Sequence, residues 1–70
     1  MDRIPVSSSN IAQIGYEQDS QILEIEFVST GVYQYSNVPQ NVFDELMAAS
    51  SKGRYFNAYI KDRYPTTRVG

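Results

Sequence analysis

A short basic segment around Gly53 holds the residue types best suited to binding an anion. Lys52 and Arg54 flank this glycine directly after Ser51, a residue type that often caps the N-terminus of a helix. If Ser51 caps a helix that begins at Lys52, two cations lie at the positive end of the helix dipole, which costs about 0.3 kcal/mol or more for each. Free backbone N–H groups and flanking cations would then form a phosphate site, because a bound anion offsets that unfavourable charge.

The same glycine fits a second interpretation. Gly53 is also a suitable left-handed C-cap for a preceding helix, since glycine adopts that conformation without steric cost. Lys52 would then lie at the negative end of that preceding helix, where a cation is favourable. The sequence leaves both interpretations open.

The residues that follow extend this basic segment and add aromatic rings. Lys61 and Arg63 continue the positive charge, and Tyr55 or Tyr59 is a candidate platform on which a nucleobase could stack. The alternative is a purely structural role for these rings, because Phe56 at the same helical spacing is expected in the core. A nucleic-acid interface and a packed helix therefore both remain compatible with this segment.

Catalytic and metal-binding chemistry find little support in the chain, which contains neither His nor Cys. The polar turn from Ser7 to Asn10 has no base to activate a hydroxyl, so we expect its serines to bond to the local backbone. Glu24 and Glu26 share one strand face, and we expect them to be solvated rather than catalytic. The sequence therefore predicts a non-enzymatic protein with no metal site and no cofactor.

Charge is distributed unevenly along the 70 residues. Residues 1–50 carry one basic and seven acidic side chains, whereas residues 51–70 carry five basic and one acidic. Because the net charge is −2, phosphate binding would have to be local to the basic end. No apolar run approaches the roughly 18 residues of a membrane span, and the first residues lack a signal-peptide pattern. We therefore expect a single cytoplasmic domain.

Alternating hydrophobicity predicts three strands, at Ile11–Glu17, Ile22–Val28 and Val32–Asn37. The loop Ser29-Thr30-Gly31 fits a three-residue hairpin, which would pair Val28 with Val32. In that register the two tyrosines of the third strand join the apolar face, with Phe27 opposite Tyr33 and Ile25 opposite Tyr35. A two-residue loop would instead place these tyrosines on the acidic face, so we favour the first register.

Helical spacing predicts one helix at Pro39–Ala49 and a second from about Lys52 to Arg63, followed by a loose tail at Thr66–Gly70. The fold class is therefore α+β, a three-stranded antiparallel meander with two short helices packed on one face. We expect one domain over residues 1–70, with its core at about 6–65. The other face of the sheet should present polar side chains to water, namely Gln13, Gly15, Glu24, Glu26, Gln34 and Ser36.

The order of several short motifs resembles the KTSC domain family, which is named for its occurrence at the C-terminus of some lysyl-tRNA synthetases. The matching stretches are Val6-x-Ser8-Ser9-Asn10-Ile11, Ile14-Gly15-Tyr16-Glu17, Leu23-x-Ile25-x-Phe27, Gly31-Val32-Tyr33-Gln34-Tyr35, Val38-Pro39-x-x-Val42, Ser51-x-Gly53-x-Tyr55-Phe56-Asn57-x-x-Ile60 and Tyr64-Pro65. The resemblance implies a stand-alone bacterial or phage form of this small domain. Its occurrence beside a tRNA-charging enzyme implies RNA binding only by association.

Two functional hypotheses follow from these features. The first is a binding module that contacts RNA or single-stranded nucleic-acid phosphate through Lys52, Gly53, Arg54, Lys61 and Arg63. The second is a protein-interaction or self-associating module, in which a partner or a second copy pairs with the edge strand Val32–Asn37, because that strand has neither Lys nor Pro to protect it.

Overall fold

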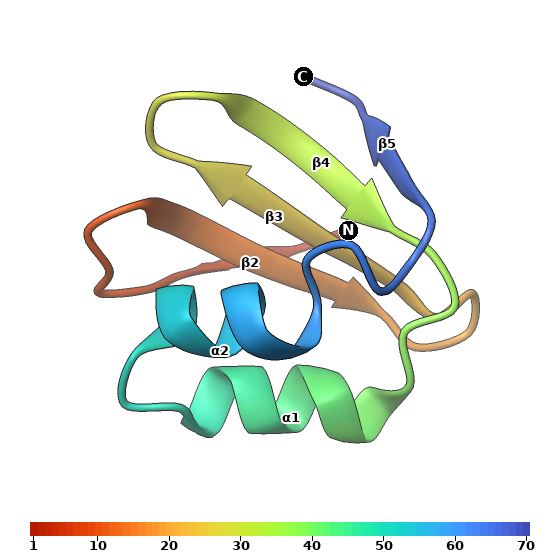
Figure 1. The fold of residues 1–70 in the computed structure, drawn as a ribbon. Coiled ribbons are helices and arrows are strands. Elements are labelled where there is room, and N and C mark those ends of the chain that lie inside the picture. Colours follow the sequence, from red (N-terminus) through yellow and green to blue (C-terminus); the bar gives the residue numbers. More distant parts are fainter.

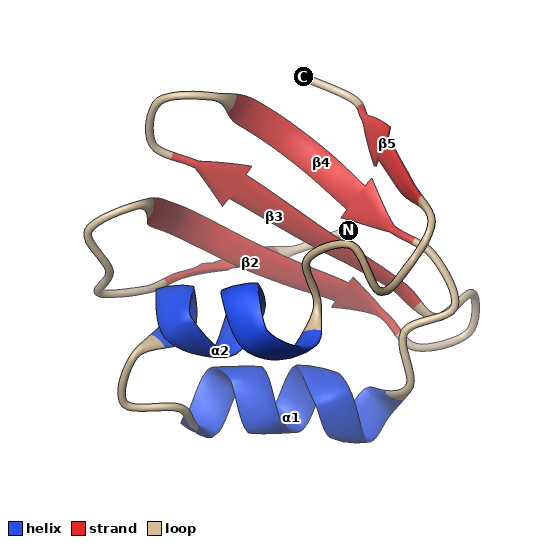
Figure 2. Cartoon of the chain, viewed as in Figure 1, coloured by secondary structure: helices blue, strands red, loops and turns tan.

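Five antiparallel strands form one sheet in which the spatial order follows the chain order (Figure 1). The computed structural model describes residues 1–70. Its elements are β1 (Arg3–Pro5), β2 (Ile11–Glu17), β3 (Ile22–Phe27), β4 (Gly31–Tyr35), α1 (Gln40–Ala48), α2 (Lys52–Tyr59) and β5 (Thr66–Arg68). Both helices lie on the same side of the sheet (Figure 2). The α+β class with an antiparallel sheet and two helices is confirmed, but the count of three strands is wrong.

The missed strands lie at the two edges of the sheet, where β1 pairs with β2 and β5 pairs with β4. The predicted loose tail is therefore wrong, because Thr66 lies opposite Tyr35 and Arg68 lies opposite Tyr33. Two physical causes favour this pairing. The edge of β4 offers unpaired N–H and C=O groups, and the β-branched threonines of β5 prefer extended backbone.

Pairing with β5 removes the free edge on which the protein-interaction hypothesis depended. The backbone of Val32 bonds with Val69 and Gly70, and the N–H of Ser36 donates to the carbonyl of Pro65. The strands now at the edges are three residues long, one ends in Pro5 and the other carries a charged arginine. Short edge strands with proline or charge disfavour pairing with another chain.

The β3–β4 hairpin has the predicted faces but a different register. Ile25 pairs with Tyr33 and Leu23 with Tyr35, which is a shift of two residues from the prediction. A two-residue shift keeps every side chain on its face, so both tyrosines still join the apolar side. Phe27 pairs with Gly31, so the three loop residues are Val28, Ser29 and Thr30. Val28 therefore belongs to the loop rather than to a pair with β4.

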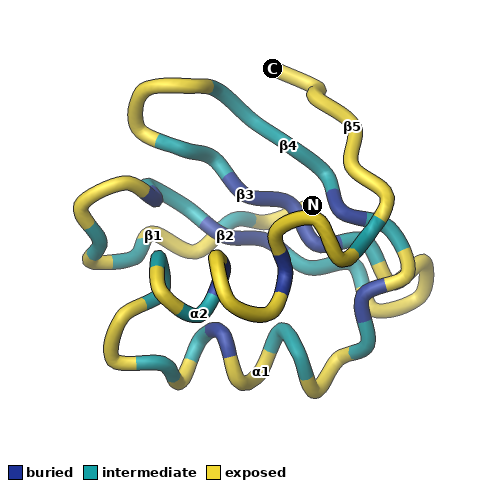
Figure 3. The backbone as a smooth tube through the Cα atoms, in the orientation of Figure 1, coloured by how far each residue is buried: buried dark blue, intermediate teal, exposed yellow.

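The core lies between the sheet and the helices. Its buried members are Ile11, Ile14, Leu23, Ile25, Tyr35, Val38, Leu46, Phe56 and Ile60. Simple alternation would have placed Ile11 and Ile14 on opposite faces of β2. Both point inward because the register shifts between Ile11 and Gln13, so one extra residue is inserted there. Figure 3 shows this buried layer, with β5 and the turn after α2 exposed outside it.

The second helix ends four residues earlier than predicted. The N–H groups of Ile60 and Lys61 both donate to the carbonyl of Phe56, and Asp62 then adopts a left-handed conformation with φ of 62°. Aspartate visits this conformation more readily than most residues. Lys61 and Arg63 therefore lie in the turn after α2 instead of on the helix.

The polar face of the sheet is less solvated than predicted. Glu24 is only 8% exposed, and its carboxylate pairs with Arg3 of β1 at 2.9 Å. Gln34 donates to the other oxygen of Glu24 at 2.9 Å, and Gln13 donates to Glu26 at 2.8 Å. The prediction of a freely solvated acidic face missed this network, because the cation comes from a strand that the sequence pattern did not reveal.

Candidate functional site

The start of α2 is built as the anion-site interpretation required. Ser51 is the N-cap, and its side-chain oxygen accepts a hydrogen bond from the N–H of Arg54 at 3.3 Å. Lys52 and Gly53 occupy the first two helical positions, whose N–H groups have no carbonyl partner in the preceding turn of the helix. The alternative role of Gly53 as the C-cap of α1 is wrong, because Ala49 fills that position.

Part of the alternative interpretation is nevertheless correct for Lys52. Its ammonium Nζ donates to the carbonyl of Ala49 at 3.1 Å. The cation therefore neutralises the negative C-terminal end of α1 while its backbone N–H belongs to the positive end of α2. One residue thus joins the ends of both helices, which lowers the cost of placing a cation at the start of α2.

A wholly polar hollow lies beside this helix start. It has a volume of about 230 Å³ and is lined by Ser7, Ser8, Ser9, Asn10, Ser50, Ser51, Lys52 and Gly53. The expected local bonding of the serine turn is confirmed, since Ser8 Oγ accepts from the N–H of Ile11 and donates to Asn10 Oδ1. No local sequence signal indicated that this turn lies against α2, because only tertiary packing brings the two segments together.

Close packing at this point explains the glycine. A Cβ atom on Gly53 would lie 2.9 Å from Asn10 Oδ1, which is closer than real Cβ atoms approach. The missing side chain therefore allows the serine turn to touch the helix. Gly53 positions the wall of the hollow and leaves its own backbone accessible there.

The remaining predicted cations are spread along and beyond α2. Arg54 is exposed on the helix, whereas Lys61 and Arg63 are exposed in the turn after it. Because a helix of eight residues is roughly 12 Å long, the cations at its start and those after its end lie well apart. None of these side chains pairs with a carboxylate, since the only ion pairs in the chain involve Arg3.

The two candidate stacking residues differ in their surroundings. Tyr55 is half-buried, and its hydroxyl donates to Glu45 of α1 at 3.0 Å, so it joins the two helices. Tyr59 is 59% exposed, and its ring centroid lies 4.8 Å from that of Tyr55. Tyr55 therefore links the two helices, whereas Tyr59 presents an accessible ring.

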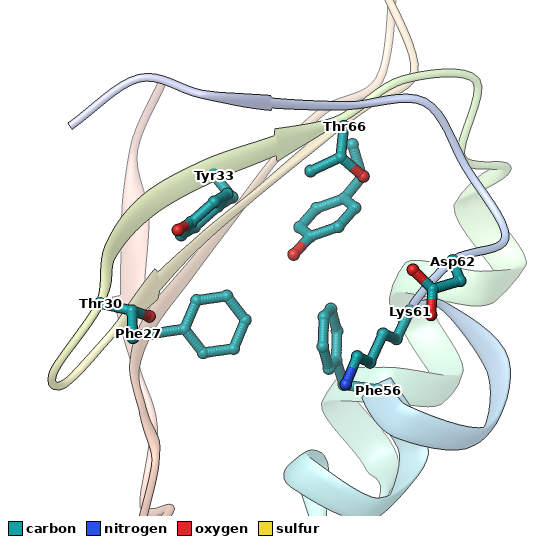
Figure 4. A pocket seen from close by; sticks show the side chains of 8 residues that line it. Phe27, Thr30, Tyr33, Phe56, Lys61, Asp62 and Thr66 are labelled. Atoms are coloured by element: carbon teal, nitrogen blue, oxygen red, sulfur yellow. The ribbon is translucent and has the colours of Figure 1, made fainter.

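A second hollow, which the sequence did not reveal, lies between the sheet and the second half of α2 with the turn that follows it. This aromatic pocket has a volume of about 490 Å³ and is lined by Phe27, Thr30, Tyr33, Tyr35, Phe56, Lys61, Asp62 and Thr66 (Figure 4). The sequence predicted all four rings as core. Tyr35 and Phe56 are indeed buried, but Phe27 and Tyr33 are only half-buried and leave one side of the cluster open.

The rings of this aromatic pocket meet edge to face. Phe27 packs in this way against Tyr33 with centroids 5.8 Å apart and against Phe56 at 5.2 Å. Tyr35 meets Phe56 at 5.5 Å in the same geometry. The guanidinium of Arg68 lies 5.8 Å from the Tyr33 centroid, which gives that ring a cation partner. These mutual contacts hold the rings in defined positions.

Burial raises the pKa of Tyr35 to about 12, and the nearby Tyr33 and Asp62 add to the effect. Because the ordinary tyrosine pKa is about 10, the unfolded chain releases this proton first on an alkaline titration. The contribution of Tyr35 to stability is therefore complete below about pH 10 and disappears as the pH rises to about 12. We expect Tyr35→Phe to reduce the loss of unfolding free energy over this interval, measured by urea denaturation with circular dichroism at successive pH values.

A matched comparison is available at Tyr55, whose pKa is also raised to about 12 by burial and by its hydrogen bond to Glu45. Tyr55→Phe should reduce the alkaline loss in the same direction. If neither variant differs from the wild type between pH 10 and 12, the two hydroxyls do not govern alkaline stability.

Comparison with known proteins identifies the fold family. A family model described as the KTSC domain matches residues 7–64. The chain belongs to the KTSC family. A crystal structure of a KTSC domain protein from Yersinia pestis superposes with a TM-score of 0.97 at 45% identity, and the match covers 99% of this chain and 97% of that one. The resemblance of the short motifs to this family is therefore confirmed.

The similar sequences include both stand-alone and fused forms of the KTSC domain. An uncharacterised protein of Stutzerimonas stutzeri is 41% identical over 64 residues, which cover 91% of this chain and 90% of the relative. A lysine–tRNA ligase of Nostoc punctiforme is 48% identical over 56 residues, which cover 80% of this chain but 10% of the ligase. The KTSC domain is thus a small module, which accounts for most of one relative and for about a tenth of the other.

Two further observations concern membranes and metals. No helix of this KTSC domain has the length and hydrophobicity needed to cross a membrane. No group of three His, Cys, Asp or Glu side chains is placed to hold a metal ion.

Proposed function

We propose that this KTSC domain is a non-enzymatic module that binds the phosphate backbone of RNA or another single-stranded nucleic acid. The contacts come from the basic surface of Lys52, Gly53, Arg54, Lys61 and Arg63. The observation that carries the proposal is the concentration of four cations without carboxylate partners along and just beyond one short helix, next to a wholly polar hollow.

The polar hollow suits one phosphate group. Backbone N–H groups at the start of α2 point along the helix axis toward its N-terminal end, and the helix dipole adds positive potential there. The Lys52 ammonium already lies close by on the carbonyl of Ala49, so it needs only a small movement to reach an anion. The hydroxyls of Ser7 and Ser9 supply neutral donors on the opposite wall.

The distribution of acidic residues restricts binding to this surface. Most carboxylates belong to residues 1–50, and two of them are engaged by Arg3 on the sheet face away from the helices. A small basic surface of this kind neutralises few phosphates. Binding should therefore be weak, with a dissociation constant on the order of 10⁻⁴–10⁻⁶ M, and should weaken steeply with salt.

The related sequences favour RNA among the possible nucleic acids. A segment 48% identical to this chain forms 10% of a protein whose name specifies tRNA as a substrate. The same fold also occurs in chains of nearly the same length as this one. A small RNA-binding module is compatible with both settings, because it works alone or raises the affinity of a fused enzyme for RNA.

We expect the double variant Lys52→Gln/Arg54→Gln to weaken binding of a short single-stranded RNA about tenfold at low salt. The variant removes two of the cations nearest the polar hollow. The slope of log K against log salt should therefore become shallower by about 0.7 for each phosphate that the protein no longer neutralises. Binding is measured by fluorescence anisotropy of labelled RNA between about 50 and 200 mM salt.

A matched control changes the net charge by the same amount elsewhere. Gln18→Glu/Ser20→Glu adds two negative charges in the exposed turn between β2 and β3 and should alter RNA affinity much less than the double variant. Amide resonances of Lys52, Gly53 and Arg54 should also shift when RNA or inorganic phosphate is added to the wild type. Unmoved amides at low ionic strength, together with no RNA binding, would rule out the proposed function.

A further inference from the structure

From its geometry we infer that the aromatic pocket binds one unpaired nucleobase, as a neutral planar ring held by stacking and by hydrogen bonds. This inference rests on the proposed function only in that the base would belong to a strand held by the basic surface. The volume of about 490 Å³ lies within the roughly 300–1,000 Å³ typical of ligand pockets. Nucleic acids bound as single strands commonly place bases on aromatic side chains in this way.

The first argument is the accessible surface of the rings. Phe27 and Tyr33 come from neighbouring strands and face a hollow whose other wall is Phe56 of α2 (Figure 4). Both strand residues are half-buried, so the hollow reaches part of each ring. Their edge-to-face contacts with one another hold the rings in place, which reduces the entropic cost of stacking a base there.

The second argument is a nearly buried hydroxyl without a partner. Tyr35 is 5% exposed and lines the pocket. The hydroxyls of Tyr16 and Tyr55 each bond to a protein acceptor, whereas that of Tyr35 makes no hydrogen bond within the chain. This hydroxyl is accessible to solvent, since every buried polar side-chain atom in the protein has a hydrogen-bond partner and this hydroxyl has none. A hydroxyl that has no partner in the protein and opens onto a pocket can donate to a ligand acceptor there.

The third argument concerns charge. Lys61 and Asp62 line the pocket together, and their opposite charges leave it without a strong preference for an ion. Aromatic side chains can also bind a cation such as a methylated ammonium group. In this pocket the ammonium of Lys61 would repel such a cation. A nucleobase instead matches the mixed edge of the pocket, since its carbonyls accept from Tyr35 or Lys61 and its amino groups donate to Asp62.

The pocket also has the correct position relative to the basic surface. Lys61 lines it, and Arg63 follows in the same turn after α2. A base stacked against the open side of these rings would therefore leave its sugar and phosphate near these two cations. The polar hollow lies at the start of α2, where a neighbouring phosphate can be held.

The test uses nucleosides, which carry a base but no phosphate. The complete 70-residue chain is titrated with uridine, cytidine, adenosine and guanosine, and the ring resonances of Phe27, Tyr33 and Phe56 are followed by NMR. We expect saturable shifts of these rings with at least one nucleoside, at an affinity that barely depends on salt. Tyr35→Phe should weaken that affinity about fivefold because one hydrogen bond is removed, and Tyr33→Leu about tenfold or more because a stacking surface is removed.

Tyr59→Ala is the matched control, because it removes an exposed aromatic ring of α2 that does not line the pocket. It should leave nucleoside affinity unchanged within about twofold, and amide spectra of each variant confirm that it is folded. Three results would overturn the inference: pocket rings that do not move with any nucleoside, binding that depends on Tyr59 rather than Tyr33, or shifts produced by tetramethylammonium instead of nucleosides. Amide shifts of Lys52 and Gly53 with inorganic phosphate report on the proposed function separately.

Discussion

Phe56→Ala is expected to lower the free energy of unfolding by about 3–5 kcal/mol, the largest effect of any single change discussed for this domain. The Phe56 ring joins α2 to the sheet by packing against Phe27 at 5.2 Å and Tyr35 at 5.5 Å. The substitution removes buried apolar surface and two edge-to-face aromatic pairs. Because a 70-residue domain has only about 4–10 kcal/mol of stability in total, much of the variant should be unfolded near physiological temperature. Urea denaturation followed by circular dichroism measures the change.

Asn57→Ala provides the control in the same helix. Asn57 is exposed, and alanine is the better helix former, so the unfolding free energy should change by no more than about 0.5 kcal/mol. A decrease below about 1 kcal/mol for Phe56→Ala would show that α2 is not fixed to the sheet through this ring. The aromatic pocket would then lack the rigid wall that the nucleobase inference requires.

Arg3→Met is expected to lower the unfolding free energy by about 1–3 kcal/mol, although Arg3 lies on a three-residue edge strand. Methionine keeps most of the aliphatic stem but removes the guanidinium that pairs with Glu24 at 2.9 Å. The Glu24 carboxylate would remain nearly buried with only the hydrogen bond from Gln34. An unpaired carboxylate in that position is costly because burial deprives it of much of its hydration.

A double-mutant cycle separates this interaction from other effects of the substitution. In a Glu24→Gln background no buried charge remains to be compensated, so Arg3→Met should cost clearly less than in the wild type. The coupling energy between the two sites should be about 1 kcal/mol or more, measured from urea unfolding of all four proteins. A coupling energy near zero would mean that Glu24 behaves as the solvated surface residue that the sequence pattern predicts.

Local sequence signals predicted correctly those features that depend on neighbouring residues. The start of α2 follows from Ser51 as a capping residue, and the apolar faces of β3 and β4 follow from strict alternation. The exact register did not follow, because both predicted alternatives began the loop after Val28, whereas the loop begins at Val28 and Phe27 pairs with Gly31. A shift of two residues leaves each side chain on the same face, so the apolar pattern cannot distinguish the two registers.

At the candidate site, too, the sequence predicted the local features but not those that depend on tertiary packing. The sequence alone indicated Lys52, Gly53 and Arg54 as an anion-binding segment, because helix capping and charge can be read from adjacent positions. It also assigned Tyr33 and Tyr35 to the apolar face, but it described every ring there as core. Whether a ring on an apolar face is fully covered depends on the length and path of the covering helix. The helix α2 packs Phe56 against Phe27 and ends at Tyr59, which leaves Phe27 and Tyr33 only half-buried.

The amino-acid sequence by itself determined the α+β class, the two helices, the faces of the central strands and the basic character of the last twenty residues, because these follow from periodicity, capping and charge along the chain. Only the tertiary structure decided that both chain ends join the sheet, that Arg3 compensates Glu24, and that α2 has a polar hollow at its start and an aromatic pocket beside its second half. The physical reason is that edge pairing, charge compensation and hollows arise from contacts between segments far apart in sequence. The spacing of residues along the chain does not reveal such contacts.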